Sequence, residues 1–592
     1  MLRTRSPRRS GEKVDVSNPS FGPHGRIAHL LMGPAPPPQL GLSVGVTGHR
    51  ADRIVDRNKV RARIEEVMAS IQTVLDEITA GHLYRAGYHM PRLITALAEG
   101  ADQIAAEAAL NLEQTLEVVL PFRQAEYERD FAEQAAREEF RRLLGRASSV
   151  LVLDGHEHEE DRALAYEAAG MALLDNCDIL IAVWDGGAGR GRGGTREVIG
   201  EAARRAMPVI IIPPDGSSIT IRGGVHLGPM RFEDVPETSI EALPDIVAAL
   251  VGTYGSETEE ADWRKLAEMP DDPIIHGAYP LLLKLAGVRP WFKKKGSWTP
   301  PEEAPGPLAD AFKWWDHAAI RAAQAFRSAV IVNFSLAALA VVLAAASVLG
   351  GDYKVYFVLA EILTIMLLLV NTWHAGRMRW QERWLESRQV AELLRVCRML
   401  RSVGIGRGIA DPGDGGSNGW YASAIARSCS LQSVELADPA NAAKALIAEV
   451  EDQAGWNEST SHRMHLAAHR IERFGEVLFV IVLAAAIGWL ALYLTMEDVA
   501  TKLKYPLTAI TAGLPAIATA SYGIRIILDF EGISVRAKQI SIGLNALLEQ
   551  WKAVPPSSAA LQEFARRAAD IMLGDVAAWR LLAEGRRLTI PG

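Results

Sequence analysis

Four long apolar stretches constrain this sequence more than any other feature. The first, at residues 327–350 (RSAVIVNFSLAALAVVLAAASVLG), carries no charged side chain after Arg327. A helix of this length crosses about 30 Å of hydrocarbon. Three further stretches follow at residues 355–373, 477–495 and 506–524. The first and third exceed the usual length of a core helix and have no polar face, so we expect four membrane spans in place of buried core helices.

Positive charge is distributed unevenly around these stretches. Lysines and arginines gather before the first and third stretches and after the second and fourth, whereas only Lys354, Lys502 and Lys504 lie in the short loops within each pair. Loops rich in Lys and Arg remain in the cytoplasm. The pattern therefore predicts two hairpins in the inner (cytoplasmic) membrane. The N-terminal domain, the segment that connects the hairpins and the C-terminus are expected in the cytoplasm.

The two hairpins look like an internal duplication. A spacing of 148 residues, which places Arg388 on Arg536, holds without a gap over about 70 positions. Each hairpin is followed by an amphipathic stretch, at residues 377–400 and 532–551. Such stretches are typical of helices that pack on their neighbours or lie at the lipid headgroups.

Charge and cysteine content exclude several classes of protein. The formal charge of −8 gives no sign of a nucleic-acid surface, so we expect no nucleic acid as partner. The three cysteines are far apart and supply neither a disulfide framework nor a CxxC metal site, so no metal is expected. The expected domains are a disordered basic tail (1–40), an α/β domain (41–215), a Pro/Gly-rich linker (216–305), the first hairpin with its helix (306–402), a connecting segment (403–460) and the second hairpin with its helices (461–592).

Short apolar runs alternate with long amphipathic runs from residue 41 onward. Runs such as LSVGVT, LEVVLP and PVIIIPP have the length and β-branched content of buried strands. Strands that alternate with helices are typical of a parallel sheet covered on both faces. We therefore expect an α/β fold with a doubly wound, mainly parallel, Rossmann-like sheet of six strands, followed by an all-α membrane region.

Glycine and polar side chains follow three of these strands. In a parallel sheet, ligands bind beyond the carboxyl ends of the strands, where glycine admits an anion and the next helix presents its N-terminal amides. One such glycine is more typical of an ordinary turn into a helix, but three loops together favour a ligand site. None of them matches GxGxxG or GxxxxGK[ST], which argues against a dinucleotide dehydrogenase or a nucleoside triphosphatase. The candidate binding residues are Thr47, Gly48, Arg50, Glu99, Gly100, Asp102, Asp185, Gly193, Gly194, Thr195 and Glu197.

Three motifs in this order, VGVTGHR, RLITALAEGADQIAAEAAL and CDILIAVWDG…GRGGTREVIGEAARRAMPVIII, resemble the SLOG superfamily of Rossmann-like nucleotide-binding domains. The resemblance covers about residues 40 to 215 and implies a pocket for a nucleotide or nucleotide-derived ligand, with no other cofactor. By motif, one side of that pocket holds Thr47, Gly48 and Arg50, with Gly100 and Asp102 beside them and Gly193, Gly194 and Thr195 at the phosphate.

Some SLOG proteins are phosphoribohydrolases, and their PGGxGTxxE pattern places a glutamate three residues after the threonine. Here Glu197 stands two residues after Thr195, and Val198 occupies the expected position. A shift of one position turns a helical side chain by about 100°. We therefore favour binding over cleavage, with a membrane-anchored phosphoribohydrolase or N-glycosidase that uses Glu197 and Arg50 as the alternative.

Two-span hairpins with a trailing helix, fused to such a domain, resemble the SLATT family of bacterial effector domains. That resemblance rests on architecture and implies permeabilisation of the membrane in a nucleotide-triggered defence or stress response. The expected function is thus a membrane-anchored nucleotide sensor and effector. Its expected partners are a nucleotide-like small molecule, the lipid bilayer and further copies of itself in a homo-oligomer.

Overall fold

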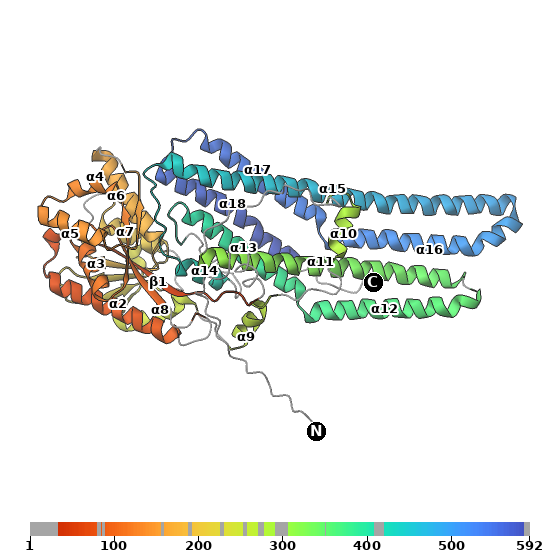
Figure 1. Ribbon diagram of the computed structural model, residues 1–592, viewed down its shortest axis with the longest axis horizontal. Helices are drawn as coiled ribbons and strands as arrows, with labels where there is room; N and C mark the ends of the chain where they lie inside the picture. The colour runs from red at the N-terminus through yellow and green to blue at the C-terminus, as the bar shows by residue number, and fades with distance from the viewer. Residues whose placement is uncertain are drawn as a thin grey trace, which may run out of the picture.

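A computed structural model gives the chain two parts, an α/β sheet domain and a set of long helices that extend from it (Figure 1). Residues 1–32, most of the expected basic tail, lie outside the described part. From Gly33 the chain is held in place, because the Trp314 indole donates to the Gly33 carbonyl (3.0 Å) and the Tyr421 hydroxyl to that of Pro36 (2.7 Å). The structure describes residues 33–79, 84–85, 89–155, 159–187, 192–224, 230–252, 257–269, 277–289, 306–349, 351–407 and 419–584.

The sheet has eight strands in the order β4-β3-β2-β1-β5-β6-β7-β8. The six strands expected from the sequence are confirmed, and all of their pairings are parallel. The strands are β1 (Leu40–Gly48), β2 (His89–Thr95), β3 (Thr115–Leu120), β4 (Ser149–Val152), β5 (Ile179–Val183), β6 (Val209–Ile212), β7 (Thr220–Arg222) and β8 (Glu237–Ser239).

The segment 216–305, expected as a linker, adds to both parts of the molecule. β7 and β8 extend the sheet with antiparallel pairings. Helix α8 (Leu243–Val251) buries Leu243 and Val247 in the core shared with α2 (Arg57–Thr79), as its apolar spacing allows. Helix α9 (Glu257–Leu266) places Trp263 in an aromatic cluster, and α10 (Ala278–Leu285) packs on the long helix that follows.

The central strand β1 has two different faces. Leu42, Val44 and Val46 point into the core covered by α2 and by helices α3 (Ala101–Asn111) and α5 (Gln134–Leu144). The alternate residues are small, which is the two-residue period of a strand. A Cβ on Gly41 would lie 2.5 Å from the Arg427 carbonyl oxygen, so this face is approached closely by chain from outside the sheet domain.

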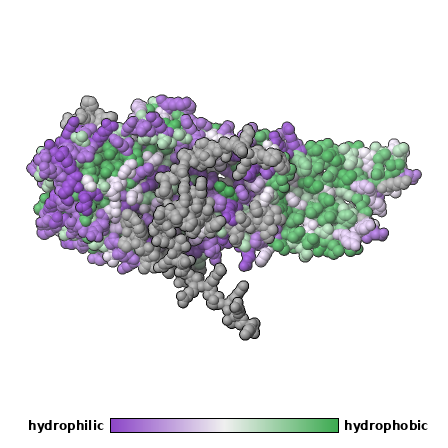
Figure 2. Space-filling model, in the orientation of Figure 1, coloured by the Kyte–Doolittle hydropathy of each residue, from purple (hydrophilic) through white to green (hydrophobic). Residues whose placement is uncertain are grey.

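Long helices form the rest of the molecule. They are α11 (Pro307–Ser347), α12 (Lys354–Arg377), α13 (Trp380–Arg401), α14 (Gly419–Ser428), α15 (Pro439–Thr495), α16 (Glu497–Ile527), α17 (Phe530–Trp551) and α18 (Ser558–Glu584). Among the described residues, four helices are long and apolar enough to cross a membrane. These four are α11, α12, α15 and α16, and Figure 2 shows that their far ends form an apolar surface. The chain is therefore built as a multi-pass membrane protein.

The four spans form an open row. α16 packs on α11 and on α15, while α12 packs on α11 (Figure 1). The outer helices α12 and α15 accordingly expose large apolar side chains such as Leu363, Leu367, Val480 and Leu483. Within the first hairpin, the buried Asn333 amide donates to Thr372 Oγ1 (2.8 Å) and accepts from Asn371 Nδ2 (2.7 Å). Interhelical hydrogen bonds of this kind hold apolar helices together in lipid.

Both hairpins end at a residue with a left-handed backbone conformation. Arg379 and Asp529 have left-handed backbone angles (φ 52° at each), and each begins a helix of 22 residues. They are 150 positions apart, so beyond the hairpin turns the two units align with a shift of 150. The gap-free spacing of 148 expected from the sequence therefore does not extend into α13 and α17, because the turn of the second hairpin is five residues shorter than that of the first and α16 is seven residues longer than α12.

The second face of the sheet is covered jointly by α6 (Glu159–Leu174), α7 (Thr195–Arg204) and the long helices. One apolar cluster contains Leu151 and Leu180 of the sheet, Leu400 of α13 and Leu446 of α15. α17 and α18 enter the same cluster. Helix α15 has 57 residues, or about 86 Å at 1.5 Å per residue, and runs unbroken from this core to the far end of the molecule.

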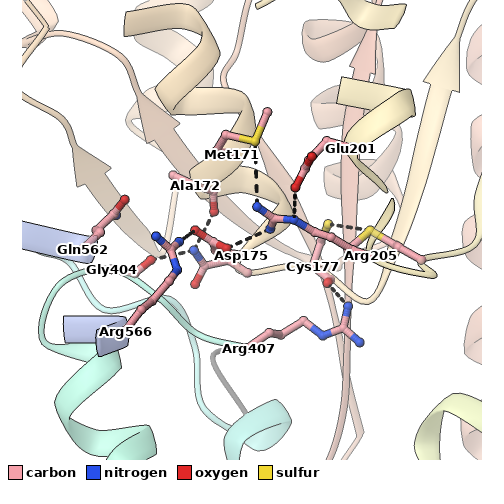
Figure 3. A network of polar contacts seen from close by, with 12 residues as sticks. Met171, Ala172, Asp175, Cys177, Glu201, Arg205, Gly404, Arg407, Gln562 and Arg566 are labelled. Carbon is pink, nitrogen blue, oxygen red and sulfur yellow. Dashed lines mark hydrogen bonds and ion pairs between the residues drawn. The ribbon is translucent and has the colours of Figure 1, made fainter. Parts of the chain in front are cut away.

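A polar network reinforces this junction (Figure 3). The buried Asp175, just after α6, accepts from Arg205 of the sheet domain (2.8 Å) and from Arg566 of α18 (2.5 Å). The amide of Asn176 donates to the Gly404 carbonyl beyond α13 (2.7 Å). The carboxylate of Asp175 therefore joins the two parts of the molecule through one pair of charge-assisted hydrogen bonds.

We predict that Asp175→Ala lowers the free energy of unfolding of the full chain by about 2 kcal/mol, because it removes the carboxylate partner of Arg566 and one of the two carboxylate partners of Arg205, the other being Glu201. Denaturant titration followed by tryptophan fluorescence in detergent measures this. The matched control is Glu563→Ala, which removes the exposed partner of Arg567 and costs less than about 0.5 kcal/mol. Equal losses in the two variants would contradict the assignment.

Candidate functional site

The strand order creates a switch point between β1 and β5. The chain runs from β1 outward to β4, then returns to β5 beside β1 and continues in the other direction. Ligands of doubly wound sheets bind outside the carboxyl ends of the strands at such a point. The loops that follow β1, β2 and β5 meet there, so the sequence-predicted residues share one edge of the sheet.

The loop after β1 is tied to the loop after β5. Nε2 of His49 lies 3.0 Å from Oδ1 of Asp185, and the backbone N–H of Asp185 donates to the same nitrogen (3.2 Å). Arg53 is 3.7 Å from the other carboxylate oxygen. The N–H of Gly187 and, to a smaller degree, His49 and Arg53 hold the pKa of Asp185 below its usual range. An exposed, ionised carboxylate therefore stands at the switch point.

The loop after β2 is held in an unusual conformation. Leu97 is left-handed (φ 56°), and Gly100 has a φ of 107°. A Cβ on Gly100 would lie 2.5 Å from the His49 carbonyl oxygen, so glycine is needed for the first two loops to touch. A left-handed leucine stores strain that the surrounding structure must stabilise, and such strain concentrates at functional sites.

Asp102 lies beneath this loop, on the first turn of α3. It is 6 % exposed, and the N–H of Ala98 donates to its Oδ2 (3.4 Å). Burial raises the pKa of Asp102 to about 6, against the lowering effect of Thr95 and Ala98. The exposed Arg50 also lowers it through its charge. Asp102 thus changes its charge near neutral pH.

The loop before α7 packs against α6. A Cβ on Gly193 (φ 74°) would lie 2.6 Å from the Glu167 backbone nitrogen, and the N–H of Gly193 donates to Glu197 Oε2 (2.7 Å). The N-cap of α7 is Gly194, and Thr195 is its first helical residue. Glu197 stabilises its own loop, and residues 188–191 of the glycine-rich stretch lie outside the described residues.

A cluster of aromatic and charged side chains, none of which was predicted from the sequence, also lies at this edge. The Tyr166 hydroxyl donates to Asp130, as does Arg162, whose guanidinium stacks over the Phe122 ring (4.5 Å). Burial, with the charges of Asp102 and Asp130, raises the pKa of Tyr127 well above its usual value. Only the spacing of Arg162 and Tyr166 on one helix face could have indicated this group.

The structure thus places every sequence-predicted residue at one edge of the sheet. Several of these residues are also required there by the packing of the fold itself. Gly48 is an example, because a Cβ there would lie 2.5 Å from Ala101 Cβ. In the part of the chain that the structure describes, no group of three His, Cys, Asp or Glu side chains could hold a metal ion. The predicted residues placed at the edge are Thr47, Gly48, Arg50, Glu99, Gly100, Asp102, Asp185, Gly193, Gly194, Thr195 and Glu197.

The helical part of the chain matches a known family of proteins. Residues 310–404 match a family of proteins of unknown function, DUF4231. The matched segment begins in the first turn of α11 and ends just after α13, so it coincides with the first hairpin and its trailing helix. No curated protein matches the chain.

We predict that Asp102→Asn removes a pH dependence of stability. Because the folded pKa is raised above the usual 3.8, Asp102 stabilises the fold most below pH 4, and about 3 kcal/mol of its contribution is lost as the pH rises from about 4 through 6. Thermal unfolding at pH 4 and pH 7 measures the difference. The midpoint of thermal unfolding of Asp102→Asn should rise relative to that of the wild type as the pH rises. The control Asp245→Asn, at an exposed position, should show no such rise. Parallel profiles for Asp102→Asn and wild type would contradict the prediction.

Proposed function

We propose that this chain is a membrane-anchored sensor and effector. A nucleotide-derived signal binds the carboxyl edge of the sheet and controls the four-helix membrane region. The observation that carries the proposal is the shared core of the junction, in which α13 and α15 pack directly on the sheet and continue into the two hairpins. A ligand acts on an equilibrium only through different affinities for its two states, and this core lets the sheet and the spans change state together.

A nucleotide as ligand is supported by the chemistry of the edge. The switch point, the N-terminus of α7 and the exposed Arg50 all favour an anionic phosphate. The exposed carboxylate of Asp185 is a hydrogen-bond acceptor of the kind that a ribose hydroxyl needs. The resemblance to SLOG domains points to the same ligand class.

The effector role is supported by the open row of spans. α12 and α15 present apolar side chains on the outside of the row, so a single copy encloses no channel by itself. Several copies that pack side by side through these helices would enclose one. The resemblance to SLATT effectors suggests permeabilisation of a bacterial inner membrane in defence or stress, and the positive-inside pattern suggests that the sheet domain lies in the cytoplasm.

The alternative, cleavage of an N-glycosidic bond, has weaker support. A general base must lie within hydrogen-bond reach of the proton that it removes. The carboxylate of Glu197 already accepts from Gly193 at 2.7 Å within its own loop. This arrangement favours a structural role for Glu197.

We predict that a candidate nucleotide releases a dye from liposomes that contain the full chain. Arg50→Ala and Gly194→Glu should lower nucleotide affinity and dye release at least tenfold, because they remove an arginine and crowd the helix N-terminus at the phosphate. Ligands retained by the purified chain, identified by mass spectrometry, select the nucleotides. The control is Arg142→Ala, on the exposed surface of α5.

Two results would overturn this proposal. Full, ligand-independent dye release by both binding variants would separate the spans from the sheet domain. Release of free base from the nucleotide by the wild type, lost in Glu197→Ala, would favour the hydrolase.

A further inference from the structure

A cavity of about 390 Å³ lies between the two hairpin units, where the helices leave the apolar end of the molecule. Its walls come from α11 and α13 of the first unit, from α15 and α17 of the second, and from α10 and α18. The volume falls in the range of small-molecule sites. This cavity is separate from the edge of the sheet and shares no lining residue with it.

Positive charge dominates the lining. One carboxylate, Glu392, faces the cavity, and it is already shared by Arg388 and by Arg395 (2.8 Å). Arg536 pairs with Asp529 at 2.9 Å. The lining arginines are Arg327, Arg388, Arg395, Arg463 and Arg536.

Two of the arginines lack an anionic partner among the described residues. The guanidinium of Arg327 stacks against the rings of Tyr279 (4.9 Å) and Trp384 (4.8 Å), and it contacts the Tyr279 hydroxyl (3.4 Å). Arg463 donates only to neutral oxygens, those of the Ser459 carbonyl (3.3 Å) and the Thr460 hydroxyl (3.2 Å). Several like charges in one partly enclosed space repel each other, so an anion that enters the cavity gains a large favourable interaction.

Guanidinium groups favour one kind of anion. Their planar donors match the oxygens of phosphate in pairs, and they form shorter and stronger hydrogen bonds with it than with neutral acceptors. Neutral polar groups, Gln453, Asn457 and Thr460, stand in the same wall and can donate to remaining oxygens or to an attached sugar or glycerol. The site therefore has the composition of a phosphate pocket.

The place of the cavity in the chain allows two sources of phosphate. Arg327 opens the first apolar stretch, and Arg463 precedes the third by 14 residues, or nearly four helical turns. A lipid headgroup at the membrane surface and a soluble phosphate could both reach arginines at this level.

We propose that this cavity binds a phosphate-bearing ligand, and that the ligand bridges the two hairpin units. The same anion contacts arginines of α11 and α13 on one side and of α15 and α17 on the other. Its presence therefore favours one separation of the units. The proposal does not rest on nucleotide binding at the edge of the sheet.

The test uses the full chain in nanodiscs of phosphatidylcholine and measures the midpoint of thermal unfolding. In one arm sodium pyrophosphate is added at constant ionic strength. In the other, 30 mol % of the lipid is replaced by phosphatidylglycerol. A ligand that binds the folded state raises the midpoint. We expect a rise of several degrees in at least one arm, and the arm that responds identifies the source.

The variant Arg327→Gln/Arg463→Gln should lose most of the rise, since it removes the two arginines without carboxylate partners. The control Arg142→Gln/Arg567→Gln makes the same change in charge at exposed positions and should keep the full rise. Arg463→Lys keeps the positive charge but removes the planar guanidinium, so this variant should retain part of the rise in the midpoint. All variants are compared as shifts from their own midpoint without ligand, so a change in basal stability leaves the result readable.

Pyrophosphate could also bind at the edge of the sheet, so the first arm is repeated in Arg50→Ala. A rise that persists in Arg50→Ala and vanishes in Arg327→Gln/Arg463→Gln supports the cavity. A rise that vanishes in Arg50→Ala assigns the binding to the edge and overturns this proposal while leaving the proposed function intact. No rise in either arm, or equal rises in the cavity variant and the wild type, also overturns it.

Discussion

Burial of the second face of the sheet is the constraint on which the rest of this structure depends. α6 and α7 cover only part of that face, and the apolar side chains of β3, β4 and β5 remain in contact with α13, α15, α17 and α18. The helices that reach the membrane are therefore also core helices of the sheet domain. Neither part can separate from the other without exposing an apolar surface, which at about 25 cal/mol per Å² strongly favours the joined state.

Short-range patterns in the sequence predict each half of the molecule well. The six parallel strands follow from β-branched runs with a buried face, and the four spans from charge-free stretches longer than a core helix. The common position of the candidate site residues follows because loops after neighbouring parallel strands share one edge of the sheet. These features depend on periods of two or 3.6 residues, which a single sequence displays directly.

The junction depends on contacts far apart in the chain, and these leave little local signal. Asp175 and Arg566 are 391 positions apart, and nothing around either residue indicates the other. One local signal did exist: Gly41, Ser43 and Gly45 on one face of β1 are all small. A strand face without large side chains indicates that another part of the chain packs closely against it. Similarly, the sequence pattern around Gly48 and Gly193 predicts an anion site. Each glycine is also required because neighbouring parts of the chain approach it too closely for a Cβ atom. Sequence alone does not separate these two reasons for a glycine.

The length of α15 gives the molecule a mechanical property. A rigid rod held at one end by a packed core acts as a lever, and a tilt of about 5° at the sheet would displace the far end of a rod of about 86 Å by about 7 Å. That displacement approaches the distance between the axes of two packed helices. Rearrangements too small to disturb the sheet could thus exchange one helix neighbour for another at the opposite side of a bilayer. In such a tilt α15 would amplify the movement, and α16, which packs along it, would be the first helix to lose or gain a neighbour.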